Sequence, residues 1–91
     1  MSQGYQVEFT KKANKALEKM DRFNKELIIS WIERKLEGCV DPRIFGKGLT
    51  GNMSERWRYR VGNYRILAKI YDQKVLIHII DIGHRDKIYT R

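Results

Sequence analysis

A run of arginines at every second position could bind a phosphate group or another polyanion. Residues 56–61, with the sequence RWRYRV, alternate basic and apolar side chains with the period of a half-buried β-strand. Gly62 and Asn63 suit a two-residue hairpin turn, and residues 64–71 would form the return strand. Directly opposed residues of a hairpin share one face of the sheet. The basic face predicted in this way comprises Arg56, Arg58, Arg60, Arg65 and Lys69.

The like charges on this basic face lower the stability of the hairpin unless an anionic partner binds them. Arg60 would lie directly opposite Arg65, and opposed like charges destabilise a hairpin by tenths of a kcal/mol up to about 1 kcal/mol. Arginine suits phosphate because its planar guanidinium donates two parallel hydrogen bonds and keeps its charge. Several arginines around one phosphate would also stabilise the extra negative charge of a pentacoordinate transition state. We therefore interpret the face as a polyanion contact, and a solvated basic surface as the simpler alternative.

The residues that could do chemistry fit cleavage of RNA without a metal or other cofactor. The sequence has no carboxylate cluster at metal-ligand spacing, no Ser-His-Asp arrangement and no phosphate-binding loop motif. RNA supplies its own nucleophile, the 2′-hydroxyl, so the protein must align it, move protons and stabilise charge. Further candidates outside the hairpin are Lys47, His78, His84, Arg85, Lys87 and Tyr89. The alternatives are a structural histidine at position 78 and a frayed chain end over residues 84–91.

The elements around the hairpin predict an α+β fold. Residues 5–9 alternate as a first strand, and two amphipathic helices follow over residues 11–20 and about 22–37, with Thr10 as N-cap and Gly38 as C-terminal stop. A two-residue turn at 72–73 would lead into a last strand, residues 74–82. We expect an antiparallel helix hairpin packed on one face of a four-stranded sheet, made of the N-terminal strand and a three-stranded antiparallel meander. The glycine-rich connection, residues 39–54, is expected to be irregular.

In that arrangement the last strand contributes to both faces of the sheet. Val75, Ile77 and Ile79 would join the core, His78 would lie opposite Leu67, and Asp81 would lie opposite Tyr64. The core face of the hairpin would hold Trp57, Tyr59, Val61, Tyr64, Ile66, Ala68 and Ile70.

The composition is that of one basic globular domain. The chain has 91 residues and a formal net charge of +8, which indicates nucleic acid, an anionic membrane or an acidic protein as partner. The single cysteine, Cys39, cannot form an internal disulfide and fits a reducing cytosol. No apolar run has the length of a signal peptide or a membrane span. We therefore expect a cytoplasmic location and no membrane association.

The order of these elements and two motifs resemble the RelE/ParE superfamily of bacterial toxins from type II toxin–antitoxin systems. The motifs are WRYRVGNYR at residues 57–65, and Gly83, His84 and Arg85 followed by Tyr89. The resemblance spans nearly the whole chain and is closest to RelE-type mRNA interferases. Such toxins enter the ribosomal A site and cut messenger RNA without metal, leaving a 2′,3′-cyclic phosphate and a 5′-hydroxyl. The resemblance implies that the partners of this chain are a cognate antitoxin, the ribosome with its RNA, and messenger RNA.

The resemblance also implies roles for individual residues. Arg65 would stabilise the transition state, Arg85 would protonate the leaving oxygen, and Tyr89 would orient or activate the 2′-hydroxyl. Arg60, like Arg58, stands where RelE has a lysine. An arginine cannot readily give up its proton, so Tyr89 or His84 would have to act as the base.

Two other functions remain open at this point. A ParE-type toxin, which shares the fold, would inhibit DNA gyrase and cut nothing. The combination of Arg65, Arg85 and Tyr89 favours the ribonuclease, because the ParE branch typically lacks the full set. A basic nucleic-acid-binding module without catalysis is the third possibility, and its binding would survive the loss of Arg85 and Tyr89.

Overall fold

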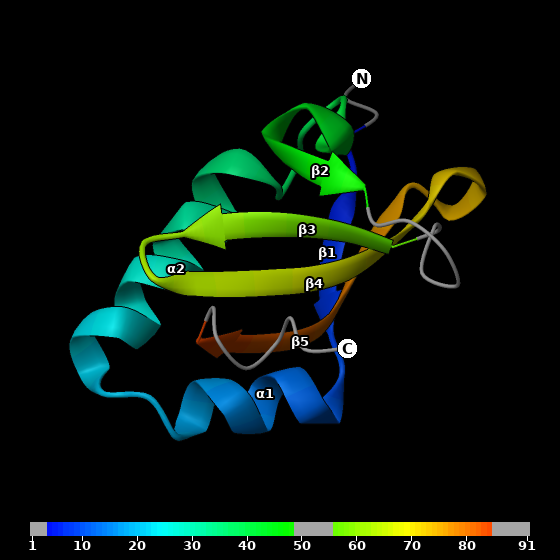
Figure 1. The fold of residues 1–91 in the computed structure, drawn as a ribbon. Coiled ribbons are helices and arrows are strands. Elements are labelled where there is room, and N and C mark those ends of the chain that lie inside the picture. Colours follow the sequence, from blue (N-terminus) through cyan, green and yellow to red (C-terminus); the bar gives the residue numbers. More distant parts are fainter. Residues whose placement is uncertain (1–3, 49–55, 85–91) are drawn as a thin grey trace.

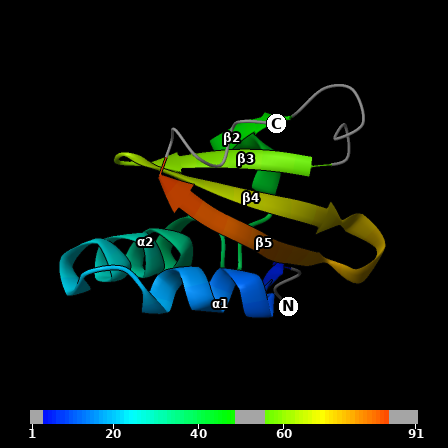
Figure 2. The ribbon, with the colours of Figure 1, turned by 60° about the horizontal axis from the view of Figure 1, so that its bottom comes forward.

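Two helices cover one face of a five-stranded sheet in the computed structural model, which describes residues 4–48 and 56–84 (Figures 1 and 2). The helices are α1 (Lys11–Glu18) and α2 (Arg22–Lys35), and two 3-10 turns are η1 (Pro42–Phe45) and η3 (Asp72–Lys74). The strands are β1 (Gln6–Phe9), β2 (Gly46–Gly48), β3 (Arg56–Val61), β4 (Tyr64–Tyr71) and β5 (Leu76–His84). The predicted α+β class and the helices on one face are confirmed.

The sheet has the order β1-β5-β4-β3-β2, with β1 parallel to β5 and the other neighbours antiparallel. The sequence predicted four strands, and the fifth, β2, comes from the glycine-rich connection that was expected to be irregular. Glycine is what lets this segment lie against β3. A Cβ at Gly46 would collide with the backbone oxygen of Arg58, and one at Gly48 would come within 2.7 Å of the Trp57 ring.

Side-chain caps begin both helices. The Thr10 hydroxyl accepts a hydrogen bond from the Ala13 backbone N–H at 3.1 Å, as the sequence predicted. The Asp21 carboxylate does the same for Asn24 at the start of α2. The second helix ends at Lys35, two residues before the predicted end, and Gly38 follows with φ +80°.

The register of the β3–β4 hairpin is the one that the sequence predicted. Arg60 lies opposite Arg65, Arg58 opposite Leu67, and Arg56 opposite Lys69. Gly62 has φ +60° and, among the described residues, Val75 is the only non-glycine residue with positive φ, so the turn has glycine first as in type II′. The core between this sheet face and the helices contains Ala13, Leu17, Ile28, Ile32, Leu36, Tyr59, Val61, Ile66, Ala68, Ile77, Ile79 and Ile82.

The predicted register of β5 was wrong, because the turn before it is longer than two residues. Residues 72–74 form η3, and Val75 adopts a left-handed conformation with φ 51° in the turn instead of joining the core strand. His78 therefore lies opposite Lys69 rather than Leu67. A shift of two residues preserves the face, so Ile77 and Ile79 are buried as expected.

A β-bulge changes the register again further along β5. Ile80 is an extra residue opposite the step from Leu67 to Ala68, so Asp81 lies opposite Leu67 rather than Tyr64. The bulge brings Ile82 into the core. Asp81 forms an ion pair with Lys12 of α1, with Nζ and Oδ2 3.4 Å apart.

Neither helix of the described residues has the length and apolar character needed to cross a membrane.

Candidate functional site

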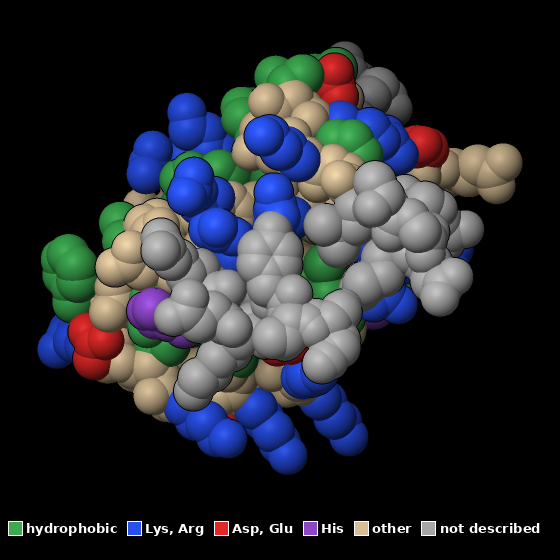
Figure 3. All heavy atoms as spheres, in the orientation of Figure 1, with side chains coloured by type: hydrophobic (Ala, Val, Ile, Leu, Met, Phe, Trp, Pro, Cys, Tyr) green, Lys and Arg blue, Asp and Glu red, His purple; other side chains and the backbone are tan. Residues whose placement is uncertain are grey.

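An open hollow of about 300 Å³ lies on the basic face, between η1, β2 and the β3–β4 hairpin. Figure 3 shows lysine and arginine side chains gathered on this side of the molecule. None of the described residues that line the hollow is acidic. They are Ile44, Phe45, Gly46, Lys47, Arg58, Arg60 and Arg65. We refer to this site as the basic hollow.

Strand pairing brings the four cations of the basic hollow together. Lys47 of β2 pairs with Arg58 of β3, and Arg60 of β3 pairs with Arg65 of β4. Alternation along each strand turns these side chains away from the helices. Three guanidinium groups and one ammonium group around one concavity create a strongly positive potential, because low-dielectric walls focus the field.

Arg65 has charged atoms that are buried. Its Nε and Nη1 atoms are buried from solvent, whereas Arg60 and Lys47 are exposed. A charge held in a partly desolvated place interacts more strongly with an anion than a charge in water. This placement suits the predicted role of Arg65 in stabilising developing negative charge.

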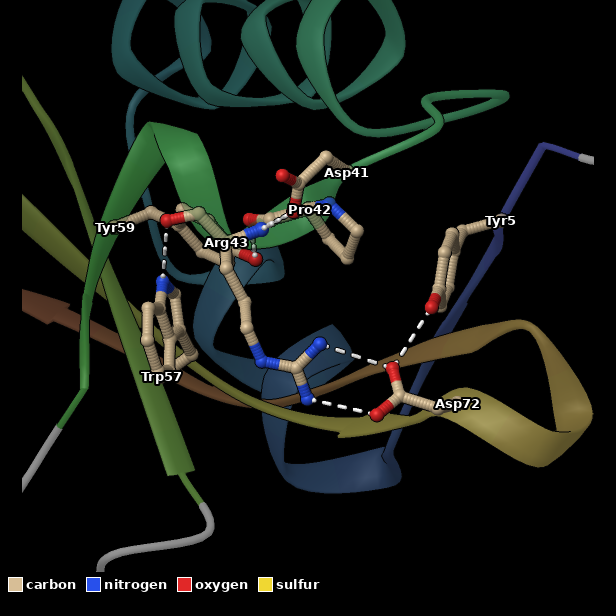
Figure 4. A network of polar contacts seen from close by, with 7 residues as sticks. All are labelled: Tyr5, Asp41, Pro42, Arg43, Trp57, Tyr59 and Asp72. Atoms are coloured by element: carbon tan, nitrogen blue, oxygen red, sulfur yellow. Dashed lines mark hydrogen bonds and ion pairs between the residues drawn. The ribbon is translucent and has the colours of Figure 1, made fainter.

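The wall opposite the arginines is held by a network of polar contacts from distant segments (Figure 4). Arg43 of η1 donates two hydrogen bonds to the Asp72 carboxylate, Nη1 to Oδ1 at 2.9 Å and Nη2 to Oδ2 at 3.1 Å. The Tyr5 hydroxyl donates to the same Oδ1 at 2.8 Å. The hydrogen bond from Arg43 lowers the pKa of Asp72, and the hydrogen bond to Asp72 raises the pKa of Tyr5.

The backbone of η1 is fixed to β3 as well. The Tyr59 hydroxyl donates to the Pro42 carbonyl at 2.7 Å, and the Trp57 Nε1–H donates to the Arg43 carbonyl at 3.2 Å. The Arg43 guanidinium lies 5.7 Å from the centre of the Trp57 ring, within the range of a cation–π contact. Burial raises the pKa of Tyr59, so this phenol stays a neutral donor. The segment that carries Ile44 and Phe45 is therefore preorganised.

The remaining predicted RNA-binding residues of the described chain lie at the other end of the basic face. Lys69 is four residues from Arg65 along β4, about 13 Å, and its neighbours across the sheet are Arg56 and His78. The His78 ring lies 6.5 Å from the Tyr71 ring, and the Lys69 Nζ lies 5.3 Å from the Tyr71 ring centre. The predicted basic face is thus a track with the hollow at one end.

His84 is placed apart from the basic hollow. It lies opposite Tyr64 at the end of β5, with the two rings 5.5 Å apart, whereas the residue opposite Arg65 is Gly83. Opposed residues share a face, so His84 belongs to the side of Tyr64 and not to that of Arg65. Arg85, Lys87 and Tyr89 lie outside the described residues.

Sequence reasoning missed four residues of the site. Ile44 and Phe45 line the basic hollow, and Arg43 and Asp72 hold the segment that carries them. Asp41 before Pro42 is a turn signal, and Asp41 does accept from the Arg43 N–H at 3.2 Å. No local pattern connects that turn with Asp72, because their contact is made only when β2 and η3 are both in place.

The described ranges, 4–48 and 56–84, contain no group of three His, Cys, Asp or Glu side chains arranged to hold a metal ion.

Comparison with known proteins gives one family and several similar structures. The model of the family described as ParE toxin of type II toxin-antitoxin system, parDE, matches residues 7–89. The toxin–antitoxin complex RelBE2 of Mycobacterium tuberculosis is 26% identical over 90% of this chain and 99% of that chain, with a TM-score of 0.77. No curated protein sequence matches the chain.

Two further structures agree in fold. A variant of the E. coli toxin RelE in the free state, with two arginines replaced by alanine, is 25% identical over 91% of this chain and 85% of that chain, with a TM-score of 0.73. The archaeal RelE–RelB complex of Pyrococcus horikoshii OT3 is 21% identical over 96% of this chain and 99% of that chain, with a TM-score of 0.68. At that identity the archaeal likeness concerns the fold alone.

Proposed function

This chain belongs to the ParE toxin family of type II toxin–antitoxin systems, and from that premise we propose that it is a ribosome-dependent endoribonuclease that cuts messenger RNA. The observation that carries the proposal is the basic hollow, in which Lys47, Arg58, Arg60 and Arg65 surround a space of about 300 Å³. Two similar structures, at 26% and 25% identity, are a RelBE2 complex and a RelE toxin.

The chemistry of the proposed reaction is attack of an RNA 2′-hydroxyl on the adjacent phosphate. The attacking oxygen forms a bond to phosphorus and loses its proton, and the bond to the 5′-oxygen breaks as that oxygen gains a proton. The phosphate carries additional negative charge in the transition state, and preorganised cations stabilise that charge without reorganisation. Arg65 takes this role in the proposal, and Arg58 and Arg60 position the strand.

Proton transfer is assigned to residues near the end of the chain. In the proposal Arg85 donates the proton to the leaving oxygen and Tyr89 orients the 2′-hydroxyl. His84 lies on the side of Tyr64 and not on that of Arg65. Tyr89 is therefore preferred to His84 as the candidate base in the proposal. Arg60 serves in the proposal as a fixed positive charge that positions the strand.

The proposal includes a cognate antitoxin and a cytoplasmic site of action. RelBE2 and the archaeal RelE–RelB structure are complexes of toxin and antitoxin. An antitoxin for this chain should carry an acidic segment that is disordered when free and orders on the basic face. The ribosome, through its RNA, and messenger RNA are the other proposed partners.

Cleavage of messenger RNA on programmed ribosomes by the purified protein tests the proposal. The expected products carry a 2′,3′-cyclic phosphate and a 5′-hydroxyl. Arg85→Ala should slow cleavage by about 10²–10³, and Tyr89→Phe should slow it while leaving the melting temperature unchanged. Full activity of both variants would refute the assigned proton-transfer residues.

A second candidate function is inhibition of DNA gyrase. The observation that favours it is the family description, which names ParE. A gyrase cleavage-complex assay on supercoiled DNA distinguishes the two. A protein that leaves ribosome-bound messenger RNA intact and traps gyrase on DNA would establish the second function and refute the first.

A further inference from the structure

The wall of the basic hollow contains apolar side chains that phosphate binding does not need. Ile44 is 68% exposed at the hollow, and Phe45 next to it is half-buried against the core. Other exposed apolar residues, Phe23 and Val40 among them, do not line it. Isolated exposed apolar side chains are ordinary, but Ile44 and Phe45 are adjacent and line the same hollow as three arginines, so the surface of the hollow is mixed.

We propose that Ile44 and Phe45 bind one base of the RNA strand while Arg58, Arg60 and Arg65 hold an adjoining phosphate. This inference rests on the proposed function for the identity of the strand. Nucleobases present apolar faces that pack against aromatic and aliphatic side chains, and their phosphates lie beside them. A surface that is apolar on one side and cationic on the other therefore matches a nucleotide better than it matches a free anion.

The size of the basic hollow fits a single nucleotide. A volume of about 300 Å³ is at the lower end of the range for small-ligand sites. One base and one phosphate would fill it, and the neighbouring nucleotides would follow the track toward Lys69 and Tyr71 on the same face.

The apolar wall is also fixed in advance. The ion pair between Arg43 and Asp72 and the bond from Tyr59 to the Pro42 carbonyl hold η1 before any ligand arrives. The Lys35 Nζ lies 5.8 Å from the Phe45 ring centre and adds a contact from α2. A preorganised wall lowers the entropy cost of binding, which is how a small apolar contact can influence affinity.

A nuclear magnetic resonance titration tests the base contact without requiring cleavage. The probe is an RNA trinucleotide with 2′-O-methyl groups, which removes the nucleophile, compared with versions that lack the base at each position in turn. Removal of the base at one position should weaken binding to the wild type by about fivefold. The same removal should weaken binding less for Ile44→Ala, because part of the contact with the base is already lost in that variant while Phe45 remains.

Charge and apolar contributions separate through salt dependence. Ile44→Ala removes no charge, so it should lower affinity while leaving the slope of log K against log salt unchanged. Arg60→Ala should reduce the magnitude of that slope by about 0.7 for each phosphate of the single strand that the variant leaves without a cation. Val40→Ala, a truncation of another exposed aliphatic residue, is the matched control and should have no effect on affinity. Ile44→Phe retains an apolar wall and should restore the dependence on the base.

Three results would overturn the inference. The first is equal affinity of Ile44→Ala and Val40→Ala for the probe. The second is an affinity of the wild type that does not change when any base of the probe is removed. The third is binding of an acidic peptide in the hollow without binding of the RNA probe, which would assign the wall to the antitoxin. The proposed function fails separately, when wild-type protein leaves ribosome-bound messenger RNA intact while the base dependence of probe binding remains.

Discussion

The charged guanidinium group of Arg65 is itself partly buried. The Nε and Nη1 atoms are buried, and the residue lies directly opposite Arg60, so two cations share one end of the basic hollow. Arg65→Ala should reduce cleavage on ribosomes by about 10²–10³, the usual effect of losing a preorganised charge donor in the transition state. Ribosome binding should weaken far less. The measurement is single-turnover cleavage beside a ribosome co-sedimentation assay.

Two other arginines of the basic face supply the controls for Arg65. Arg56→Ala removes a charge at the far end of the basic face and should affect strand binding but not the rate at saturation. Arg60→Lys keeps the charge and should be tolerated, because Arg60 is proposed to position the strand and not to act in the chemical step. If Arg56→Ala slowed the chemical step as much as Arg65→Ala did, the loss would reflect the general field of the face and not a specific role of Arg65.

Val75 carries backbone strain that the fold tolerates in the β4–β5 turn. Its φ of 51° is unfavourable for a β-branched residue, and a left-handed conformation costs an L-residue about 1–2 kcal/mol. Val75→Asn should therefore raise the free energy of unfolding by about 0.5–1 kcal/mol, since asparagine tolerates this region and little packing is lost. Urea denaturation measures the change. Val40→Asn, at an exposed valine without positive φ, should leave it unaltered, and a loss of stability in Val75→Asn would contradict the strain.

At the scale of elements, the Arg43–Asp72 ion pair links η1 to η3. Asp72→Asn should lower the melting temperature by about 2–4 °C at neutral pH, because an exposed pair contributes about 0.5 kcal/mol and 1 kcal/mol shifts the melting temperature of a domain of this size by about 4–8 °C. The folded-state pKa of Asp72 is lowered by Arg43, so this contribution is present above the unfolded pKa and is lost as the pH falls through the folded one. The difference between wild type and Asp72→Asn should thus begin to shrink below about pH 4 and disappear only once the pH is below the lowered folded-state pKa of Asp72. A difference that persisted in acid would exclude the ion pair as its source.

Local rules predicted some elements fully and others only in part. The β3–β4 hairpin followed from alternation and the Gly62 turn, and with it the grouping of Arg58, Arg60 and Arg65. The β5 register did not, because a 3-10 turn and a bulge at Ile80 add residues that periodicity cannot show. The β2 strand was hidden, since glycine usually weakens a strand and here permits close approach to Trp57.

The same reasons limited the prediction of the site. The arginines of the hairpin are a local pattern and could be read from the sequence, whereas the apolar wall depends on where η1 docks. That docking is set by long-range contacts, Tyr59 to Pro42 and Arg43 to Asp72, separated by 17 and 29 residues. The α+β class was predictable because each amphipathic element needs one face to cover.

At the scale of the whole molecule, the net charge of +8 is distributed on both sides of the sheet. Lys47 is exposed on the basic face, and Lys15 is exposed on α1, which packs on the other side. Long-range attraction between such a toxin and an acidic antitoxin should accelerate their encounter. At 0.1 M salt this attraction should be largely screened at separations greater than about 10 Å. The association rate constant should therefore fall as ionic strength rises, with little change in the dissociation rate constant.

Charge reversal separates net charge from the location of charge. Lys47→Glu and Lys15→Glu change the net charge by the same amount, but only the first lies on the face that the antitoxin is proposed to cover. Stopped-flow measurements at low ionic strength should show a much larger decrease of the association rate constant for Lys47→Glu, because steering depends on the potential along the approach path. Equal decreases would mean that net charge alone attracts the antitoxin. An association rate constant independent of salt in the wild type would exclude electrostatic capture, and the antitoxin would then have to recognise the toxin through apolar contacts.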